Sequence, residues 1–369
     1  MNFFSILGKY VTRQFLANFF LVFFAILGVI LLFDSIESLR RISGREDVTM
    51  WFAAQYAVTR IAKTVEIVIP FVLMVAAMIT FWRLSKNNEF VIIRAAGVSI
   101  FGFLRPLIIT AFILGLVNIM LFNPVAAKMF EWHEVLSYRL TSRNPNAVLF
   151  SSKGLWIREA IGEGKVLLLQ AKKLRQESDD SLWMRDVSIT ELNSQTQISK
   201  SYEAYFATLE GQTFHLKDVK MLIGGQPVKT MADFEYKTNI DMQRIKENFI
   251  DPDAISFWQL PDTIAFYENA GFSARQHWMR YLNLLMSPFL LIGMLMMAAV
   301  FMLQNTLRGS AIMWRVVISI GVGFSIYFLS QVVYAFGVNG YIPVWLAVSA
   351  PTIIIILIAS SLLIRTDEV

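Results

Sequence analysis

Six apolar segments, each long enough to cross a lipid bilayer, constrain the fold of this chain more than any other feature of its sequence. A helix needs about 20 consecutive apolar residues to span the hydrocarbon core. The segments are Phe15–Phe33, a segment centred on Ile67–Trp82 that begins near Trp51, Pro106–Ala127, a segment within Tyr281–Thr306, Val316–Phe336 and Val344–Ile364. Apolar residues make up 56% of the chain and charged residues only 17%, against about a quarter in average domains, so much of the chain is expected to lie in lipid.

The last two of these segments follow each other closely. No charged residue stands between Arg315 and Arg365, and this stretch is too long for one span. Glycine, asparagine and proline mark turns. The stretch is interrupted by Gly337, Asn339, Gly340 and Pro343. We therefore expect two spans with a short turn between them.

The first segment follows two basic residues, Lys9 and Arg13, and in this respect resembles a secretory signal peptide. Its apolar run extends from Gln14 to Phe33, about 20 residues, whereas the apolar region of a signal peptide has about 7–15. No pair of small residues spaced for cleavage follows this run. We therefore expect the segment to be retained as a membrane anchor.

Basic residues predict the orientation of the spans, because cytoplasmic loops carry an excess of Lys and Arg. The excess lies before the first span, between the second and third, and between the fourth and fifth: Lys9, Arg13, Arg83, Lys86, Arg94, Arg105, Arg308 and Arg315. We therefore expect both termini in the cytoplasm and the segment between the third and fourth spans outside it. The net charge of +5 fits this bias, and the sequence has no basic block of the kind that binds nucleic acid.

The segment between the third and fourth spans reads as a separate β domain. Short runs in which apolar and polar residues alternate are separated by Gly, Asn, Asp and Ser, a spacing typical of a sandwich or jelly roll. The expected strands are Gly154–Arg158, Lys165–Ala171, Leu182–Glu191, Ser201–Leu209, Gln212–Met221 and Met231–Lys237. The expected fold is a membrane α-helical protein with six transmembrane helices in a 3+3 arrangement and an inserted all-β, jelly-roll-like domain. The expected domains are residues 1–139, 140–265 and 266–369.

The motifs of several enzyme classes are missing from the sequence. It contains no G-x-x-x-x-G-K-[ST] loop, so any ATP hydrolysis would take place on another subunit. His133 and Glu134 begin like the zinc motif H-E-x-x-H, but Ser137 stands in the fifth position. There is no cysteine, no G-x-S-x-G motif and no pair of residues suited to intramembrane hydrolysis. We therefore expect no catalytic residue, no metal and no cofactor.

The loop between the second and third spans, Lys86–Ser99, is expected to contain a short cytoplasmic helix. Asn88 can cap it, Glu89 suits its positive N-terminus and Gly97 can end it. The apolar side chains expected near one face are Phe90, Ile93 and Ala96. Two interpretations stay open: a connector that lies on the membrane, or a helix that docks into a cytoplasmic partner and offers Glu89 to a basic residue.

Charged residues at the outer ends of the spans form a second candidate site. Glu66 and Lys63 lie there on the second span, one turn from Arg60, as a functional cluster or as interfacial snorkelling residues. Basic residues on this side are not explained by the orientation bias; they are Arg40, Arg41, Lys128, Arg139 and Arg143. They would either bind a polyanionic headgroup in the outer leaflet or be ordinary solvated charges.

Five local motifs occur in a fixed order along the chain. They are Asn88–Gly97 (NEFVIIRAAG), Gly154-Leu155-Trp156, Asp251–Ser256 (DPDAIS), Arg315-Val316-Val317 followed by Gly321, Gly323 and Phe324, and Tyr341-Ile342-Pro343. Together with the layout of three spans, a β domain and three spans, this order resembles the LptF/LptG permeases of the lipopolysaccharide exporter, and most closely the LptG branch. The likeness covers essentially the whole chain.

The resemblance implies a non-hydrolytic half-transporter in the bacterial inner membrane. Members of the family pair with a sister permease (here LptF), a dimeric cytoplasmic ATPase (LptB) and a periplasmic single-span protein (LptC). Such a complex extracts lipopolysaccharide from the periplasmic leaflet and passes it through a β jelly roll toward the outer membrane. The alternative is a structural or sensor protein whose β domain binds a partner outside the membrane.

The resemblance also implies roles for particular residues. By position, Lys86–Gly97 would be the coupling helix of the family, the segment that contacts the ATPase. Its contact residues would be Glu89, Phe90, Ile93, Arg94 and Gly97. Candidates for the lipid headgroup are Arg40, Arg41, Lys63, Lys128 and Arg139. Exposing an acyl chain of about a dozen carbons to water costs roughly 10 kcal/mol, so the β domain would need an apolar path. Candidates for that path are Leu155, Ile157, Val166, Leu168 and Phe206, which would otherwise form a closed sandwich core.

Overall fold

The computed structural model describes residues 3–42, 50–141, 147–151, 154–162, 165–178, 180–193, 198–223, 228–247, 251–303 and 311–367. The chain divides into two compact units. We call Met1–His133, Ser256–Trp258 and Trp278–Val369 the helical unit, and Glu134–Ile255 and Gln259–His277 the sheet unit. The expected class, membrane helices with an inserted antiparallel sheet, is confirmed.

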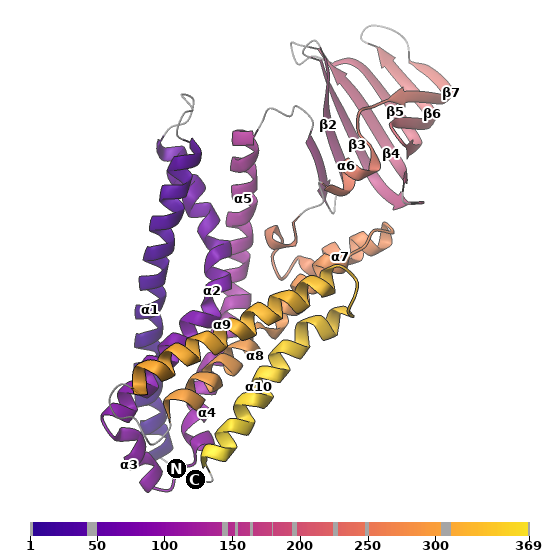
Figure 1. The fold of residues 1–369 in the computed structure, drawn as a ribbon. Coiled ribbons are helices and arrows are strands. Elements are labelled where there is room, and N and C mark those ends of the chain that lie inside the picture. Colours follow the sequence, from indigo (N-terminus) through magenta and orange to yellow (C-terminus); the bar gives the residue numbers. More distant parts are fainter. Residues whose placement is uncertain are drawn as a thin grey trace. The chain divides into compact units, whose positions relative to one another are not determined.

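Among the described residues, six helices are long and apolar enough to cross a membrane. The first two spans are α1 (Phe3–Ile42) and α2 (Met50–Lys86), which lie side by side (Figure 1). The third runs through α4 (Ile100–Val117), the π-helical turn η1 (Asn118–Phe122) and α5 (Asn123–Thr141). The last three are α8 (Arg275–Met302), α9 (Ala311–Val338) and α10 (Val344–Asp367). The expected cytoplasmic helix is α3 (Glu89–Ala95), between α2 and α4.

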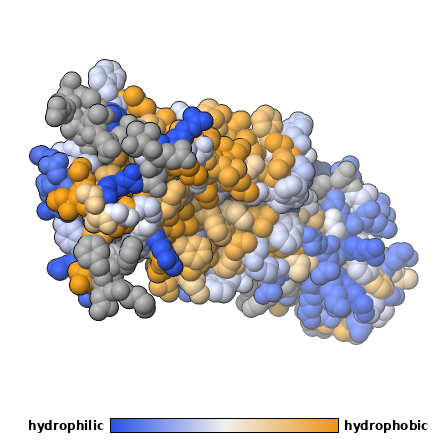
Figure 2. Space-filling model, turned by 90° about the horizontal axis from the view of Figure 1, so that it is seen from below, coloured by the Kyte–Doolittle hydropathy of each residue, from blue (hydrophilic) through white to orange (hydrophobic). Residues whose placement is uncertain are grey.

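The helical unit has an apolar core and an apolar surface. Its most buried large side chains come mainly from α1, α2, α4 and α8, and include Phe15, Leu73, Phe81, Leu104 and Leu295. Apolar residues also cover the outside of the helices, as Figure 2 shows for one face. An exposed apolar surface of this extent is unfavourable in water but costs nothing against lipid, as expected for membrane spans.

The third and fourth spans touch at a glycine. A Cβ atom added to Gly115 of α4 would lie 2.5 Å from Cα of Pro288 in α8. We therefore expect Gly115→Ala to push these helices apart and to lower the free energy of unfolding by about 1–3 kcal/mol. Gly28→Ala is the matched control, because a Cβ atom at Gly28 of α1 would meet nothing within 4 Å. Equal thermal unfolding midpoints for the two purified variants in detergent would contradict this expectation.

In the part of the sheet unit that the structure describes, seven antiparallel strands lie in chain order (Figure 1). They are β1 (Ala147–Ser151), β2 (Gly154–Gly162), β3 (Lys165–Gln176), β4 (Ser181–Leu192), β5 (Ile198–Glu210), β6 (Thr213–Ile223) and β7 (Lys229–Lys237). All six expected strands are present, and β1 is additional. The connectivity differs from the expected jelly roll, which needs long crossing connections. Each strand instead pairs with the next along the chain, and Gly211, with φ +59°, lies in the tight turn between β5 and β6.

One face of the sheet is buried, and we call it the inner face. Its side chains are Leu155, Ile157, Glu159, Leu167, Leu169, Ala171, Leu174, Leu182, Met184, Val187, Ile189, Tyr202, Ala204, Ala207, Leu209, Phe214, Leu216 and Val219. The carboxylate of Glu159 accepts hydrogen bonds from Thr238 Oγ1 (2.6 Å), Asn239 N (2.7 Å) and Asn239 Nδ2 (2.8 Å). This buried carboxylate thereby fixes the chain that leaves β7 toward α6 (Met242–Glu247).

A row of unpaired residues crosses the sheet from β3 to β7. The residues that the register leaves without a Cα partner are Lys172, Asp186, Tyr205, Asp218 and Ala232. Asp186 and Asp218 both have φ of 54°, a left-handed conformation that Asp tolerates better than most residues. In each strand of this row, two consecutive residues point away from the inner face. The alternation of inner and outer residues along the strand therefore shifts by one position.

Candidate functional site

The short helix α3 ends as the sequence predicts but begins differently. Gly97 has φ +81°, and its backbone N–H donates a hydrogen bond to Arg94 O (2.9 Å). The backbone N–H of Val98 donates to Ile93 O (3.4 Å). This is the Schellman arrangement, in which a left-handed glycine closes the helix. At the other end Asn88 has φ 57° and its side chain makes no capping hydrogen bond, so the expected Asn88 cap is wrong. An N-cap side chain needs extended backbone to reach the helix N–H groups, and the left-handed conformation prevents this.

The two faces of α3 have different surroundings. Phe90 and Ile93 are buried in the helical core, with the Phe90 ring 5.5 Å from the Phe103 ring of α4. Ala96, which we expected beside them, is exposed. The opposite face presents Val91 and Ile92, which are 51% and 66% exposed and which the sequence reasoning missed. Two of the expected coupling residues, Phe90 and Ile93, therefore anchor the helix, and the exposed apolar face is formed by residues that were not expected to take part.

Glu89 lies at the start of α3 and is held by two neighbours. The hydroxyl of Tyr10 in α1 donates to Glu89 Oε2 (3.1 Å), and Asn87 Nδ2 donates to Oε1 (3.3 Å). Arg94 lies in the last turn of the same helix, where a cation is favourable. The first span is thus hydrogen-bonded to the carboxylate that the sequence singles out.

A buried charged network joins three spans of the helical unit. Arg280 Nη2 of α8 lies 2.5 Å from Glu66 Oε2 of α2, and both side chains are nearly buried, at 11% and 12% exposure. Asn123 Nδ2, at the start of α5, donates to Glu66 Oε1 (3.2 Å), and its Oδ1 accepts from Phe257 N (2.8 Å). We call Glu66, Arg280 and Asn123 the Glu66 network.

The sequence singled out Glu66 but not its partners. The sequence grouped Arg60 and Lys63 with Glu66. Arg60 Nε lies 3.8 Å from Asp34 Oδ1 of α1, and Lys63 Nζ lies 4.7 Å from the centre of the Phe130 ring. The signal that could have found Arg280 is a charged residue in an apolar span, which needs a partner in the membrane. Asn123 carries no comparable signal.

The expected headgroup residues lie on different helices. Arg40 of α1 is exposed, and its Nη2 lies 3.1 Å from Glu37 Oε2. Lys128 of α5 is also exposed. Lys63 is on α2. The side chains of Arg41 and Arg139 lie outside the described part of the structure, although their backbones belong to α1 and α5. The headgroup role stays a prediction.

The expected path residues divide between the two faces of the sheet. Leu155 and Ile157 are on the inner face, paired with Ala171 and Leu169 of β3. Val166 and Leu168 alternate with the buried Leu167 and Leu169, so they point to the opposite, outer face and are only half-buried. The expectation of one shared face is therefore wrong, because β3 carries apolar residues on both sides and only the register decides which side is inner.

Phe206 also lies on the outer face, because it follows the unpaired Tyr205. Its ring centre lies 5.3 Å from that of Trp183 and 4.5 Å from that of Tyr205. The Arg185 guanidinium lies over both Tyr205 (4.6 Å) and Phe206 (5.9 Å). The outer face thus holds a small aromatic cluster with a cation stacked on it.

One end of the inner face is polar. The Tyr236 hydroxyl donates to Glu191 Oε1 (3.1 Å), and burial, followed by the charge of Glu191, raises the pKa of Tyr236 well above its usual range. Burial and Glu191 also raise the pKa of Tyr202. Both hydroxyls therefore stay protonated near neutral pH. Among the described residues, no three His, Cys, Asp or Glu side chains gather to hold a metal ion.

The fold and these sites define a multi-pass membrane protein with an inserted β domain and a short helix between its second and third spans. The profile of the family "Lipopolysaccharide export system permease LptF/LptG" matches residues 9–365. The chain therefore belongs to the LptF/LptG family and is a component of a lipopolysaccharide export system rather than a hydrolase. This confirms the resemblance seen in the sequence.

Two similar proteins are both named lipopolysaccharide export system permease protein LptG. They come from Escherichia coli strain K12 and from Escherichia coli O6:H1 strain CFT073. Each is 22% identical to this chain over 339 residues, which cover 89% of this chain and 89% of the relative. The similarity thus extends through both groups of spans and the sheet.

Proposed function

We propose that this chain is the permease subunit of an ABC-type exporter that extracts lipopolysaccharide from the periplasmic leaflet of the inner membrane. The family match over residues 9–365 carries the proposal, because it includes both groups of spans, α3 and the sheet. The sequence has no nucleotide-binding loop, so the energy comes from a separate cytoplasmic ATPase, the LptB dimer. The other proposed partners are the sister permease LptF and the periplasmic protein LptC.

The proposed orientation places both termini and α3 in the cytoplasm. The basic residues of the α2–α4 loop support it. In this orientation Val91 and Ile92 face the ATPase, while Phe90 and Ile93 attach α3 to the bundle. Glu89 lies at the start of α3, and Arg94 and Gly97 lie at its end, so these three residues mark the two ends of the contact with the ATPase.

The proposed lipid route begins at the outer ends of the first three spans. Arg40, Arg41, Lys63, Lys128 and Arg139 supply positive charge there for an anionic headgroup. The acyl chains then follow the inner face of the sheet, to which each strand from β2 to β6 contributes buried apolar side chains. The opening of this buried face is the step that ATP hydrolysis drives.

The strand register provides a sharp test of this route. A photo-crosslinker at Ile157 samples the inner face, and one at Leu168 samples the outer face of the neighbouring strand. In membranes that contain the complete exporter, we expect ATP-dependent adducts with lipopolysaccharide at Ile157 and none at Leu168. Adducts at Leu168 alone would move the path to the outer face. The absence of adducts at both positions would refute passage along this sheet.

A further inference from the structure

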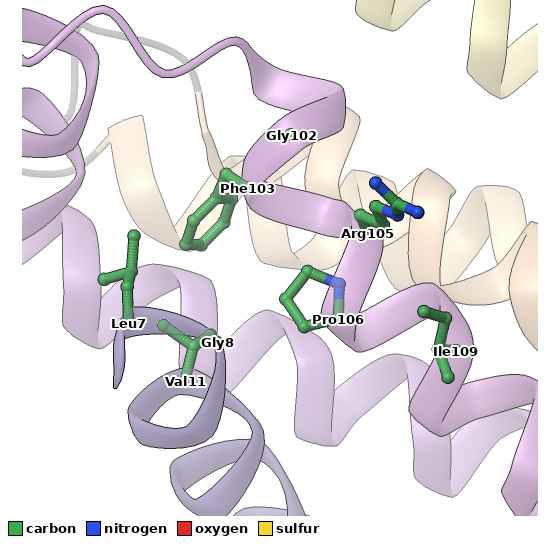
Figure 3. A pocket seen from close by; sticks show the side chains of 8 residues that line it. All are labelled: Leu7, Gly8, Val11, Gly102, Phe103, Arg105, Pro106 and Ile109. Atoms are coloured by element: carbon green, nitrogen blue, oxygen red, sulfur yellow. The ribbon is translucent and has the colours of Figure 1, made fainter. Parts of the chain in front are cut away.

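A groove of about 300 Å³ lies between the first turns of α1 and of α4 (Figure 3). It is lined by Leu7, Gly8 and Val11 of α1 and by Gly102, Phe103, Arg105, Pro106 and Ile109 of α4. Val11 and Phe103 are buried at its base, whereas Ile109 is 51% exposed at its rim. Its volume is at the lower end of the range for small-molecule pockets, roughly 300–1,000 Å³.

Two glycines and a proline give the groove its shape. Gly8 and Gly102 contribute no side chain, and Gly8 lies close enough to Pro106 that a Cβ atom would meet the proline Cβ at 3.4 Å. Pro106 has no N–H group, so the Gly102 carbonyl receives no hydrogen bond from the residue four positions later. That carbonyl is an acceptor beside an otherwise apolar groove.

The charge at the groove is positive. Arg105 is the one charged residue among the eight that line it, and it is exposed. In Figure 3 its guanidinium points away from Leu7 and Phe103. Lys9 and Arg13 are exposed on the same stretch of α1. An amphiphile with an alkyl chain and an anionic head has the complementary chemistry.

We propose that this groove binds an anionic phospholipid, with one acyl chain between α1 and α4 and the phosphate on Arg105. A protein helix, with a diameter of about 10–12 Å, is too wide for it. The assignment of the lipid to the cytoplasmic leaflet rests on the proposed orientation. The site is separate from the export route, which uses the other ends of the spans.

The test uses the full-length chain in detergent with phosphatidylglycerol that carries a photoreactive group on its acyl chain, and with the matching phosphatidylcholine. We expect phosphatidylglycerol to label peptides that contain Leu7–Val11 and Gly102–Ile109. Ile109→Trp fills the groove and should reduce this labelling to background. Ile113→Trp is the matched control, because Ile113 is 52% exposed one turn further along α4, does not line the groove, and should leave labelling unchanged.

Arg105→Gln tests the headgroup. It should lower phosphatidylglycerol labelling about fivefold, the loss expected for one basic side chain near an anionic lipid surface, and leave phosphatidylcholine labelling unchanged. Equal labelling by the two lipids in the unmodified chain, or equal effects of the two Trp variants, would overturn the proposal. Loss of labelling when LptF is co-purified would also overturn the proposal, because LptF would then occupy the groove. The assay needs neither ATPase nor lipopolysaccharide, so its failure would leave the proposed export function untouched.

Discussion

Ile92→Asp should abolish stable association of this chain with its cytoplasmic ATPase while leaving its own fold intact. Ile92 is the most exposed apolar side chain of α3, and the helix is attached to the bundle by the opposite face, through Phe90 and Ile93. A carboxylate at the centre of an apolar contact loses its hydration without gaining a partner. The expected cost is about 2 kcal/mol or more, a loss of affinity of roughly 30-fold or greater.

Co-purification of the ATPase with the tagged chain measures this effect, together with the rate of ATP hydrolysis in the complex. Ile198→Asp is the matched control, since Ile198 is exposed to nearly the same degree, 64% against 66%, but lies on β5 of the sheet unit. Glu89→Arg, which also removes the acceptor for Tyr10, should weaken the same association. Normal co-purification of both α3 variants would show that α3 is only a connector on the membrane.

Arg280→Met should destabilise the helical unit by about 3–5 kcal/mol, because it leaves the Glu66 carboxylate buried without its cation. In this variant only Asn123 donates a hydrogen bond to the Glu66 carboxylate, which is shielded from water. Thermal unfolding in detergent should show a large drop in the midpoint. Arg365→Met, which removes an exposed cation from the last turn of α10, should change stability by no more than about 0.5 kcal/mol.

The double variant Glu66→Gln/Arg280→Met separates charge from packing. Gln keeps an oxygen that can accept from Asn123 but carries no charge, so most of the lost stability should return. A double variant as unstable as Arg280→Met would contradict this account, because it would place the cost in the lost Arg280 contacts rather than in an unpaired carboxylate.

The sequence predicted the features of this protein that depend on local composition. The six spans follow from apolar length alone, since lipid sets a minimum that few other segments reach. The end of α3 at Gly97 was predictable because a left-handed position strongly favours glycine. The faces of α3 were not, since seven residues are too few for a helical periodicity to identify the buried side.

Features that depend on distant partners could not be predicted in this way. Arg280 is 214 residues from Glu66, and nothing near either residue specifies the other. In β3, consecutive apolar residues from Val166 to Leu169 fit either face of the sheet, and the pairing of Leu169 with Ile157 decides between them. The order of the strands in the sheet was not predictable for a similar reason, because strand lengths and turn spacing do not determine which strands pair.

The π-helical turn in the third span limits how this chain can change during evolution. Asn123 N donates to the carbonyl of Asn118, five residues earlier, so η1 holds one residue more than a regular helical turn. Loss of one residue there would restore an ordinary helix and leave Gly115 and Asn123 on their present faces, because the wide turn already takes up the extra residue. A regular helical turn without that loss would instead rotate Gly115 relative to Asn123 by about 100°. Gly115 packs on Pro288, and Asn123 bonds Glu66. A relative with a single-residue gap at this place can therefore keep both its glycine and its asparagine, whereas a relative without the gap needs the π-helical turn to keep them in place.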